Sequence, residues 1–444
     1  MKSTYDKIAL LHHTGGGNLG DDATLDVVIS NIRQRRPEAD IAILSMNPMD
    51  TEQRHGVRSF PLRRHTWSIG YNSEKVSATE TKKSKLRDWL QATRNPAIRL
   101  PRAIFNEIAF LASSYRNLKG YGQLVVSGGG QLTERSGPWG FPYAILIWVI
   151  LAKLAKIKCI FLSVGAGPLK HPLSRFFVAR ALSMGDYVSF RDMQSRDLAR
   201  DVGFSGECQV VPDNAYLLEH VRSGTLPAAR TRTVVGIAPM PYPFCDPREF
   251  ASGHQEIYDN YISKFAAFAS MLVKESCSLE LFGSDVGADS SAIEDLRRCL
   301  RNNHNIVTPP YEPVSSVEGL LDQMGTFDYV VTCRFHGVVL AHILNKPILA
   351  ISHHPKVANL MEQLGLEQYC VDIQTYDPGD LANRFKALAH HDREVRQSLA
   401  ASLVANRLKV ASQFDQLFSS VDVEVDRGLT DAMLEATVTG HGVR

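Results

Sequence analysis

Residues 7–23 read KIALLHHTGGGNLGDDA, an apolar run that leads into a glycine-rich turn and then into two aspartates. A buried strand followed by a glycine turn and a helix is the opening of a βα unit. The helix is predicted over residues 22–35, before Pro37, and the next apolar run, IAILS, predicts a second short strand. This alternation predicts a parallel sheet with helices on both of its faces.

The same alternation continues along the chain and predicts a fold of two doubly wound, Rossmann-like α/β domains with a cleft between them. The first domain is expected over residues 1–225 and the second over residues 233–400, with a polar linker, SGTLPAARTRT, between the sheets. A helical and then polar tail is expected over residues 401–444. The strands predicted in the second domain are VVGIAPM, SLELFGSD, a segment near NIVTP, DYVVTC and PILAIS.

The composition is that of a folded protein and excludes several functional classes. Hydrophobic residues make up 44% of the 444 residues, charged residues make up 22%, and the net charge of +2 gives no reason to expect a nucleic-acid partner. The seven cysteines include no CxxC pair, which argues against a zinc site or disulfide framework and favours a reducing cytoplasm. The N-terminus lacks the features of a signal peptide, and the longest apolar run, Tyr143–Ala152, is too short to span a bilayer.

The regular pattern is interrupted over residues 54–119, which contain 14 Lys and Arg against 4 Asp and Glu. One interpretation is a solvated surface insertion, with the segment SEKVSATETKKSK as a mobile loop. The other is a basic lid or patch that meets anionic or lipid-linked substrates, which would bring the protein into peripheral contact with the inner face of a membrane.

The first glycine turn satisfies the GxGxxG pattern at Gly15, Gly17 and Gly20. A dinucleotide site would need an acidic residue at the end of the second strand, and IAILS instead runs into Met46, so a nicotinamide oxidoreductase is disfavoured. Two carboxylates after the turn suit the hydroxyl groups of a sugar better than a phosphate. The alternative is that Asp22 is a helix N-cap and that the glycines only form a tight turn.

Further glycines and polar residues follow other predicted strands. Gly128–Gly130 follows LVVS, Gly165 and Gly167 follow CIFLS, Arg191 follows YVSF, and Asp213 and Asn214 follow QVVP. Glycine at a sheet edge permits close approach of a ligand or tight packing of a helix. An arginine there can hold a carboxylate or phosphate with its planar fork, or form a surface salt bridge.

The densest group of chemically active residues lies in the stretch VVTCRFHGVVLAHILNKPILAISHHPKV. Arg334 and His336 stand where a strand gives way to a helix expected to begin near Gly337. Alternation along an extended segment places these two side chains on the same side, so that a cation, a proton donor and a helix N-terminus converge. Lys356 is a candidate phosphate contact, and His353 and His354 are interpreted as core or hinge residues.

Taken together, these segments resemble the polysaccharide pyruvyl transferase family. The likeness rests on GGGNLGDDA, SGGGQL, SVGAGP, SFRDMQS, VPDNA, CRFHGVVLAHILNKP and HHPKVANLMEQLGL. It covers both predicted domains and is weak across the basic insertion and the tail. The resemblance implies a two-domain fold like that of GT-B glycosyltransferases. It also implies transfer of the enolpyruvyl unit of phosphoenolpyruvate to a saccharide, which forms a pyruvate ketal and releases phosphate.

The resemblance assigns roles to individual residues. His336 would be the general acid, and the donor would be bound by Arg191, Arg334, Phe335, Gly337 and Lys356. The acceptor would lie near Gly17, Asn18, Asp21, Gly129 and Gly130, while Asp213, Asn214 and Gly165 are left without an assigned role. Phe335 stands where an aliphatic residue is expected, which matters little if this position contributes mainly backbone.

Neither a cofactor nor a metal is expected in the chemistry, because arginines can neutralise the donor and no metal-ligand spacing such as HExxH is present. Two other functions stay open. One is a nucleotide-sugar glycosyltransferase of the same architecture, and the other is a non-catalytic saccharide-binding protein. The acceptor could be a polysaccharide precursor or a lipid-linked saccharide.

Overall fold

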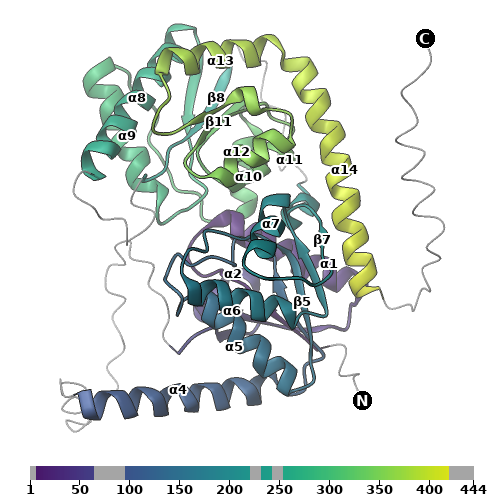
Figure 1. The fold of residues 1–444 in the computed structure, drawn as a ribbon. Coiled ribbons are helices and arrows are strands. Elements are labelled where there is room, and N and C mark those ends of the chain that lie inside the picture. The colour runs from purple at the N-terminus through teal and green to yellow at the C-terminus, as the bar shows by residue number, and fades with distance from the viewer. Residues whose placement is uncertain (1–6, 65–95, 221–231, 243–253, 420–444) are drawn as a thin grey trace, which may run out of the picture.

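The computed structural model describes residues 7–64, 96–220, 232–242 and 254–419, and the side chains of residues 96–103 lie outside this description. It contains two parallel sheets flanked by helices, one above the other in Figure 1. The prediction of two doubly wound α/β domains is confirmed. The predicted linker and the segment Ser73–Lys85 lie almost wholly outside the described residues.

The first domain is built on a seven-stranded parallel sheet with the strand order β3-β2-β1-β4-β5-β6-β7. Its strands are β1 (Lys7–Leu11), β2 (Asp40–Ser45), β3 (Ser59–Pro61), β4 (Gln123–Ser127), β5 (Lys158–Val164), β6 (Tyr187–Phe190) and β7 (Gln209–Val210). Its helices are α1 (Leu19–Arg35), α2 (Pro48–His55), α4 (Pro96–Leu118), α5 (Phe141–Leu154), α6 (Pro172–Ser183), α7 (Met193–Asp201) and the short 3₁₀ helix η2 (Asn214–Leu217). The strand order reverses between β1 and β4, so a ligand crevice is expected at their carboxyl ends.

The second domain has a five-stranded parallel sheet in the order β12-β11-β10-β8-β9. Its strands are β8 (Val234–Ala238), β9 (Ser278–Leu281), β10 (Tyr329–Thr332), β11 (Ile348–Ser352) and β12 (Cys370–Asp372). Its helices are α8 (His254–Lys274), α9 (Asp289–His304), α10 (Val317–Gly325), α11 (Phe335–Ile343), α12 (Pro355–Gln363) and α13 (Pro378–His390), and the chain continues into α14 (Asp392–Phe418).

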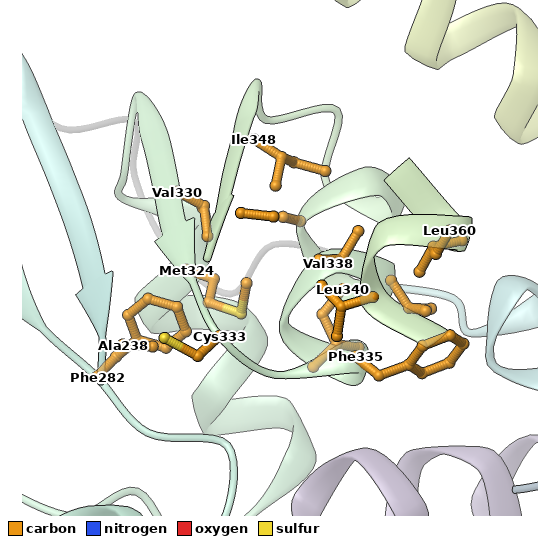
Figure 2. Close-up of a cluster of buried hydrophobic side chains, with 14 of the residues drawn as sticks. Ala238, Phe282, Met324, Val330, Cys333, Phe335, Val338, Leu340, Ile348 and Leu360 are labelled. Atoms are coloured by element: carbon orange, nitrogen blue, oxygen red, sulfur yellow. The ribbon is translucent and has the colours of Figure 1, made fainter. Parts of the chain in front are cut away.

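A continuous apolar core stabilises the second sheet. Figure 2 shows Val330 and Ile348 of neighbouring strands beside Val338 and Leu340 of α11, with Phe335 at the edge of the cluster. The central strands β8, β10 and β11 are almost wholly buried, which explains why their sequences are unbroken apolar runs rather than alternating ones.

The predicted boundary at residue 400 is wrong, because it falls inside α14. This long helix leaves the second domain and runs down to the first, as Figure 1 shows in yellow. Near its end Gln413 is buried and accepts a hydrogen bond from the Ser189 hydroxyl, while Asp415 pairs with Arg35 at 2.8 Å. The described part of the tail is therefore a brace between the domains, and residues 420–444 lie outside the described part.

One predicted element is not found, and one helix was not predicted. Residues 305–309 form no strand, because β9 is the edge of its sheet and Val307, 81% exposed, precedes two prolines. Within the predicted insertion, residues 96–118 form helix α4, an element that was not predicted from the sequence. Leu118 of that helix is buried in the core of the first domain, so its C-terminal end is part of the fold.

Candidate active site

The strand-to-helix junction that carries His336 is tightly packed. Strand β10 ends at Thr332, Arg334 is the N-cap of α11, and the Arg334 backbone N–H donates to the Thr332 hydroxyl over 3.2 Å. A Cβ on Gly337 would overlap that hydroxyl, so this glycine allows the helix to pack closely on its strand, and its predicted contact with the donor stays a prediction. The helix begins at Phe335, two residues earlier than predicted.

Because the helix begins there, the expectation that Arg334 and His336 point to the same side of an extended segment is wrong. The guanidinium of Arg334 turns toward the second domain, where its Nε donates to Asp289 Oδ1 over 3.0 Å. Asp285 lies 3.6 Å from the same guanidinium. His336 instead faces the first domain, where it meets Asp21 and Asp213.

Helix α1 of the first domain lies directly against His336. A Cβ on Gly20 would overlap the Cβ of the histidine, so only glycine permits this approach. The preceding turn is fixed by backbone hydrogen bonds across the domains, from Leu19 N–H to Ser284 carbonyl (2.8 Å) and from Val286 N–H to Gly17 carbonyl (3.0 Å). The glycine-rich turn therefore joins the two domains at the site.

This finding corrects the interpretation of the first turn. Helix α1 starts at Leu19 and its N-cap is Asn18, whose side chain accepts from the Gly20 N–H, so Asp22 is not the cap. Asp22 is buried and accepts from the Thr14 hydroxyl over 2.5 Å. The Gly17 carbonyl and the Asn18 side-chain oxygen accept hydrogen bonds within the protein, and the prediction that this turn contacts the acceptor stays a prediction.

Asp21 orients the imidazole of His336. Its Oδ1 lies 3.6 Å from His336 Nδ1, and its Oδ2 lies 3.0 Å from His13 Nε2. Burial alone would raise the pKa of the Asp21 carboxyl. The nearby imidazoles of His13 and His336 outweigh burial, so that this pKa falls well below its usual value. An ionised carboxylate beside Nδ1 favours a proton on that nitrogen, while Nε2 lies toward Asp213.

The other nitrogen of His336 faces Asp213. Nε2 lies 3.9 Å from Asp213 Oδ2, and neither atom has a hydrogen-bond partner among the described residues although both are buried. Asp213 is held in place by its other oxygen, which accepts from the Ala215 N–H and the Thr24 hydroxyl. Buried polar groups normally pair, so this gap is where a substrate group or water would complete the network.

Burial is the largest cause that lowers the pKa of His336 below its ordinary value. Asp21 and Asp213 oppose that shift, while Arg191 and Lys356 add to it. The imidazole is therefore neutral at neutral pH until additional negative charge enters the cleft.

Arg191 reaches the same cleft from the end of β6. A Cβ on Gly165 would lie 2.5 Å from its Nε, so this glycine makes room for the guanidinium. Its Nη1 lies 3.5 Å from Asp213 Oδ2, and its Cζ lies 4.0 Å from the centre of the Phe335 ring. The side chain of Phe335 thus forms a cation–π contact between the domains, which corrects the expectation that this position contributes mainly backbone.

Lys356, in the first turn of α12, completes the cationic side of the cleft. Burial and the positive charge of Arg191 lower the pKa of Lys356 to about 8, although Asp21 opposes the shift. A cavity of about 70 Å³ lies here between the two domains. Its lining includes Arg191, Asp213, Phe335, Lys356, Asn359 and Asn406. Three predicted donor-site residues, one from the first domain and two from the second, thus share one cavity with Asp213.

Of the remaining predicted residues, some lie beside the site and others pack behind it. A Cβ on Gly129 would lie 2.5 Å from the His13 ring, so Gly129 packs against that histidine. Gly130 faces Arg191, whose Nη2 lies 3.9 Å from the position that a Cβ on this glycine would take. Asn214 is buried behind the site and donates to the Leu162 carbonyl. His354 caps α12, and His353 pairs with the Cys333 carbonyl, as core or hinge residues do.

Sequence reasoning missed three residues that shape the site: Gly20 as the contact of His336, His13 as the partner of Asp21, and Asp289 as the partner of Arg334. The local signals were the position of His13 two residues after a strand and of Asp289 at the start of a helix. Within the described ranges, no group of three or more His, Cys, Asp or Glu side chains is arranged to hold a metal ion.

With this geometry established, sequence comparison assigns a family. A sequence model of polysaccharide pyruvyl transferases matches residues 18–355, more than half of the chain. The chain belongs to the polysaccharide pyruvyl transferase family. The match begins at Asn18 and includes Gly20, Arg191, Asp213 and the Arg334–Gly337 junction, so most of the site described above lies within it. The protein is therefore a transferase with a role in polysaccharide synthesis.

One curated relative of this pyruvyl transferase family member is the amylovoran biosynthesis protein AmsJ of Erwinia amylovora. The two are 20% identical, and the alignment covers 90% of this chain and 96% of AmsJ. The similarity therefore extends over almost the whole of both proteins and includes both domains.

Solved structures show the same architecture at low sequence identity. HepE from Anabaena, in complex with UDP, has a TM-score of 0.52 at 12% identity and covers 97% of this chain and 100% of its own. A glycosyltransferase from Rickettsia africae has a TM-score of 0.53 at 9% identity and covers 94% of this chain and 99% of its own. These likenesses confirm the GT-B-like fold of the transferase and nothing finer.

Proposed function

We propose that this transferase moves the enolpyruvyl unit of phosphoenolpyruvate onto a saccharide, forming a pyruvate ketal and releasing phosphate. The product would belong to a cell-surface polysaccharide or glycolipid. The observation that carries the proposal is the pair His336 Nε2 and Asp213 Oδ2, two buried atoms without a hydrogen-bond partner in the described part of the chain. Asp213 also lines a cavity together with Arg191 and Lys356. An acid, a carboxylate and two cations are what this reaction requires.

The two domains would share the binding of the donor. Arg191 and Lys356 would hold its phosphate and carboxylate from opposite sides of the domain interface. Arg334 is the weakest of the predicted donor contacts, because Asp289 and Asp285 already offset its charge. In this proposal Arg334 contributes to the positive potential near the donor, and Asp289 fixes its orientation.

His336 would protonate the methylene carbon of the donor. The negative charge of phosphate and carboxylate raises the pKa of the imidazole when the donor binds, which counteracts the effect of burial. Protonation gives the central carbon positive character, and a sugar hydroxyl then attacks it. The Oδ2 atom of Asp213 would accept the proton of that hydroxyl.

The step balances without a redox cofactor. One hydroxyl adds to the central carbon, the C–O bond to phosphate breaks with its electron pair on the phosphate, and a second hydroxyl closes the ketal. The proton gained at the methylene carbon turns it into a methyl group. Both hydroxyl protons are accounted for by this methyl group and by the released phosphate.

Phosphate release from phosphoenolpyruvate, measured in the presence of candidate saccharides, tests the proposal. The wild-type protein and a His304→Ala control, altered at the far end of α9, are expected to release phosphate only when donor and acceptor are both present. His336→Ala is expected to lose turnover while calorimetry still detects donor binding. The nucleotide-sugar alternative is favoured if phosphoenolpyruvate is inert and a nucleotide sugar is consumed.

A further inference from the structure

Helix α4 carries an apolar stripe that continues beyond the body of the protein. Ile104, Ile108, Leu111, Tyr115 and Leu118 are spaced by four and three residues, which places them on one face of a helix. Leu111, Tyr115 and Leu118 pack against the core of the first domain. The other two are 52% and 58% exposed, and Figure 1 shows this helix extending past the domain at the bottom of the view.

A second group of exposed apolar side chains lies beside this helix. Trp139 is 59% exposed and Phe176 is 57% exposed. The rings of Trp139 and Phe177 contact each other at 5.7 Å between centroids, and Tyr143 packs on both. The Tyr143 hydroxyl donates to Glu107 of α4 over 3.4 Å, which joins the aromatic group to the helix. We call this combined area the α4–α6 surface; its exposed apolar members are Ile104, Phe105, Ile108, Trp139, Leu173 and Phe176.

The α4–α6 surface is bordered by positive charge. The guanidinium of Arg63 lies 5.0 Å from the centre of the Tyr143 ring, and Arg64 lies 3.7 Å from Glu107. The exposed Lys170 precedes α6. Exposed aromatic and aliphatic side chains next to arginine and lysine are the composition of a protein surface that lies in a membrane interface.

We propose that the α4–α6 surface docks on a membrane leaflet that carries anionic lipid headgroups. The apolar side chains would enter the boundary between headgroups and acyl chains, and the bordering cations would pair with headgroup phosphates. Within the described segments no helix is long and apolar enough to cross a bilayer, so the contact would be with the surface. The proposal concerns a face of the first domain and does not depend on the donor or on the chemistry of the cleft.

Cosedimentation of the full chain with vesicles, in the absence of donor and acceptor, tests this proposal. Vesicles of phosphatidylcholine alone are compared with vesicles that contain about one third phosphatidylglycerol. The wild-type protein is expected to bind only the anionic vesicles, and to be released when salt is raised from about 0.1 M to about 0.5 M. The double variant Ile104→Asp/Ile108→Asp is expected to bind at least about tenfold more weakly.

The matched control is Val404→Asp/Leu408→Asp on α14, which replaces two exposed apolar residues one helical turn apart in another part of the molecule. It is expected to bind like the wild type. Circular dichroism verifies folding, and Phe105→Glu, altering a side chain that is 69% exposed, serves if the double variant does not fold.

Two outcomes would overturn the proposal. One is a cosedimentation result in which the wild type does not bind anionic vesicles, or in which the α4 variants bind them as strongly as the wild type does. The other is found by sedimentation velocity: a wild-type dimer that becomes a monomer in the α4 variant, with no vesicle binding by either, would make this face an interface between copies of the chain.

Discussion

The Nε2 atom of His336 and the Oδ2 atom of Asp213 face each other across the domain interface at 3.9 Å, and both are buried without a hydrogen-bond partner among the described residues. On the opposite side of the imidazole, Asp21 approaches Nδ1. The histidine thus has a carboxylate beside each of its nitrogens, Asp21 at Nδ1 and Asp213 at Nε2.

This arrangement predicts two different pH profiles. Burial lowers the pKa of His336 in the free enzyme, so kcat/KM for the donor is expected to fall with rising pH through a pKa below the ordinary value of histidine. In the enzyme–donor complex the negative charge of the donor raises that pKa, so kcat is expected to fall at a higher pH. Steady-state kinetics measure both. Identical profiles, neither dependent on His336, would remove the acid role.

Gly20 is predicted to be irreplaceable. The new methyl group of Gly20→Ala would overlap the His336 side chain, so the variant is expected to lose about 1–3 kcal/mol of unfolding free energy and most of its activity. Gly325→Ala is the control, because no atom of the described residues outside its own helix backbone and chain neighbours lies within 4 Å of the position that the new methyl group would take, and alanine favours helices. Chemical denaturation compares the two. Equal stability of both variants would show that α1 does not lie against His336.

The contact between Arg191 and Phe335 is predicted to couple the two domains. A double-mutant cycle of Arg191→Met and Phe335→Leu, read from unfolding free energies, is expected to give a coupling of about 0.5–2 kcal/mol. Leucine restores the aliphatic side chain that the family resemblance implies at this position. If the two effects simply add, the ring serves only as an apolar filler.

Lys356 is predicted to make donor binding weaken in alkaline solution. With its pKa lowered to about 8, mainly by burial and by Arg191, the ammonium is charged at neutral pH and loses its charge as the pH rises through that value. Calorimetry is expected to show donor affinity falling above that pH in the wild type. Lys356→Arg keeps its charge in alkali and is expected to lose this dependence. A wild-type affinity that stays constant into strongly alkaline solution would exclude Lys356 from the donor site.

His55 is predicted to make the fold less stable in alkaline solution. Burial lowers its pKa, but the carboxylates of Asp22 and Asp26 outweigh burial and raise the pKa to about 9. Because the folded-state pKa lies above the ordinary value, the contribution is complete below about pH 6.5 and is lost as the pH rises through about 9.

Unfolding free energies measured across this range test the prediction for His55. The wild type is expected to lose about 1–3 kcal/mol between the two limits, and His55→Gln is expected to show a flatter profile. His304→Gln, a change at the C-terminal end of α9 and away from Asp22 and Asp26, is the control and should follow the wild type. An unchanged slope in His55→Gln would place the titration elsewhere.

The sequence predicted those features of the fold that depend on local patterns. Runs such as those of β1 and β10 are apolar almost throughout because both faces of the sheets are buried, and turn residues follow their carboxyl ends. Asn18 was missed as the cap because two aspartates stood nearby. The segment near Val307 was predicted as a strand from two adjacent apolar residues after a helix, and it does not pair with the sheet. Two apolar residues do not indicate whether a segment will pair with a sheet edge.

The site was predictable only in part, because several of its contacts join distant segments. Arg191, Phe335, His336 and Lys356 follow strand ends, so their shared location could be inferred. The contact of Gly20 with His336 and the pairing of Arg334 with Asp289 depend on how the domains and loops pack. No spacing in the sequence indicates either contact.

Mass spectrometry of candidate saccharide acceptors incubated with phosphoenolpyruvate tests the central claim most directly. Wild-type protein is predicted to add the mass of a pyruvate ketal to an acceptor with equimolar release of phosphate, and His336→Ala is predicted to leave the acceptor unchanged. Consumption of a nucleotide sugar, with an acceptor that gains a sugar residue and never a ketal, would contradict it.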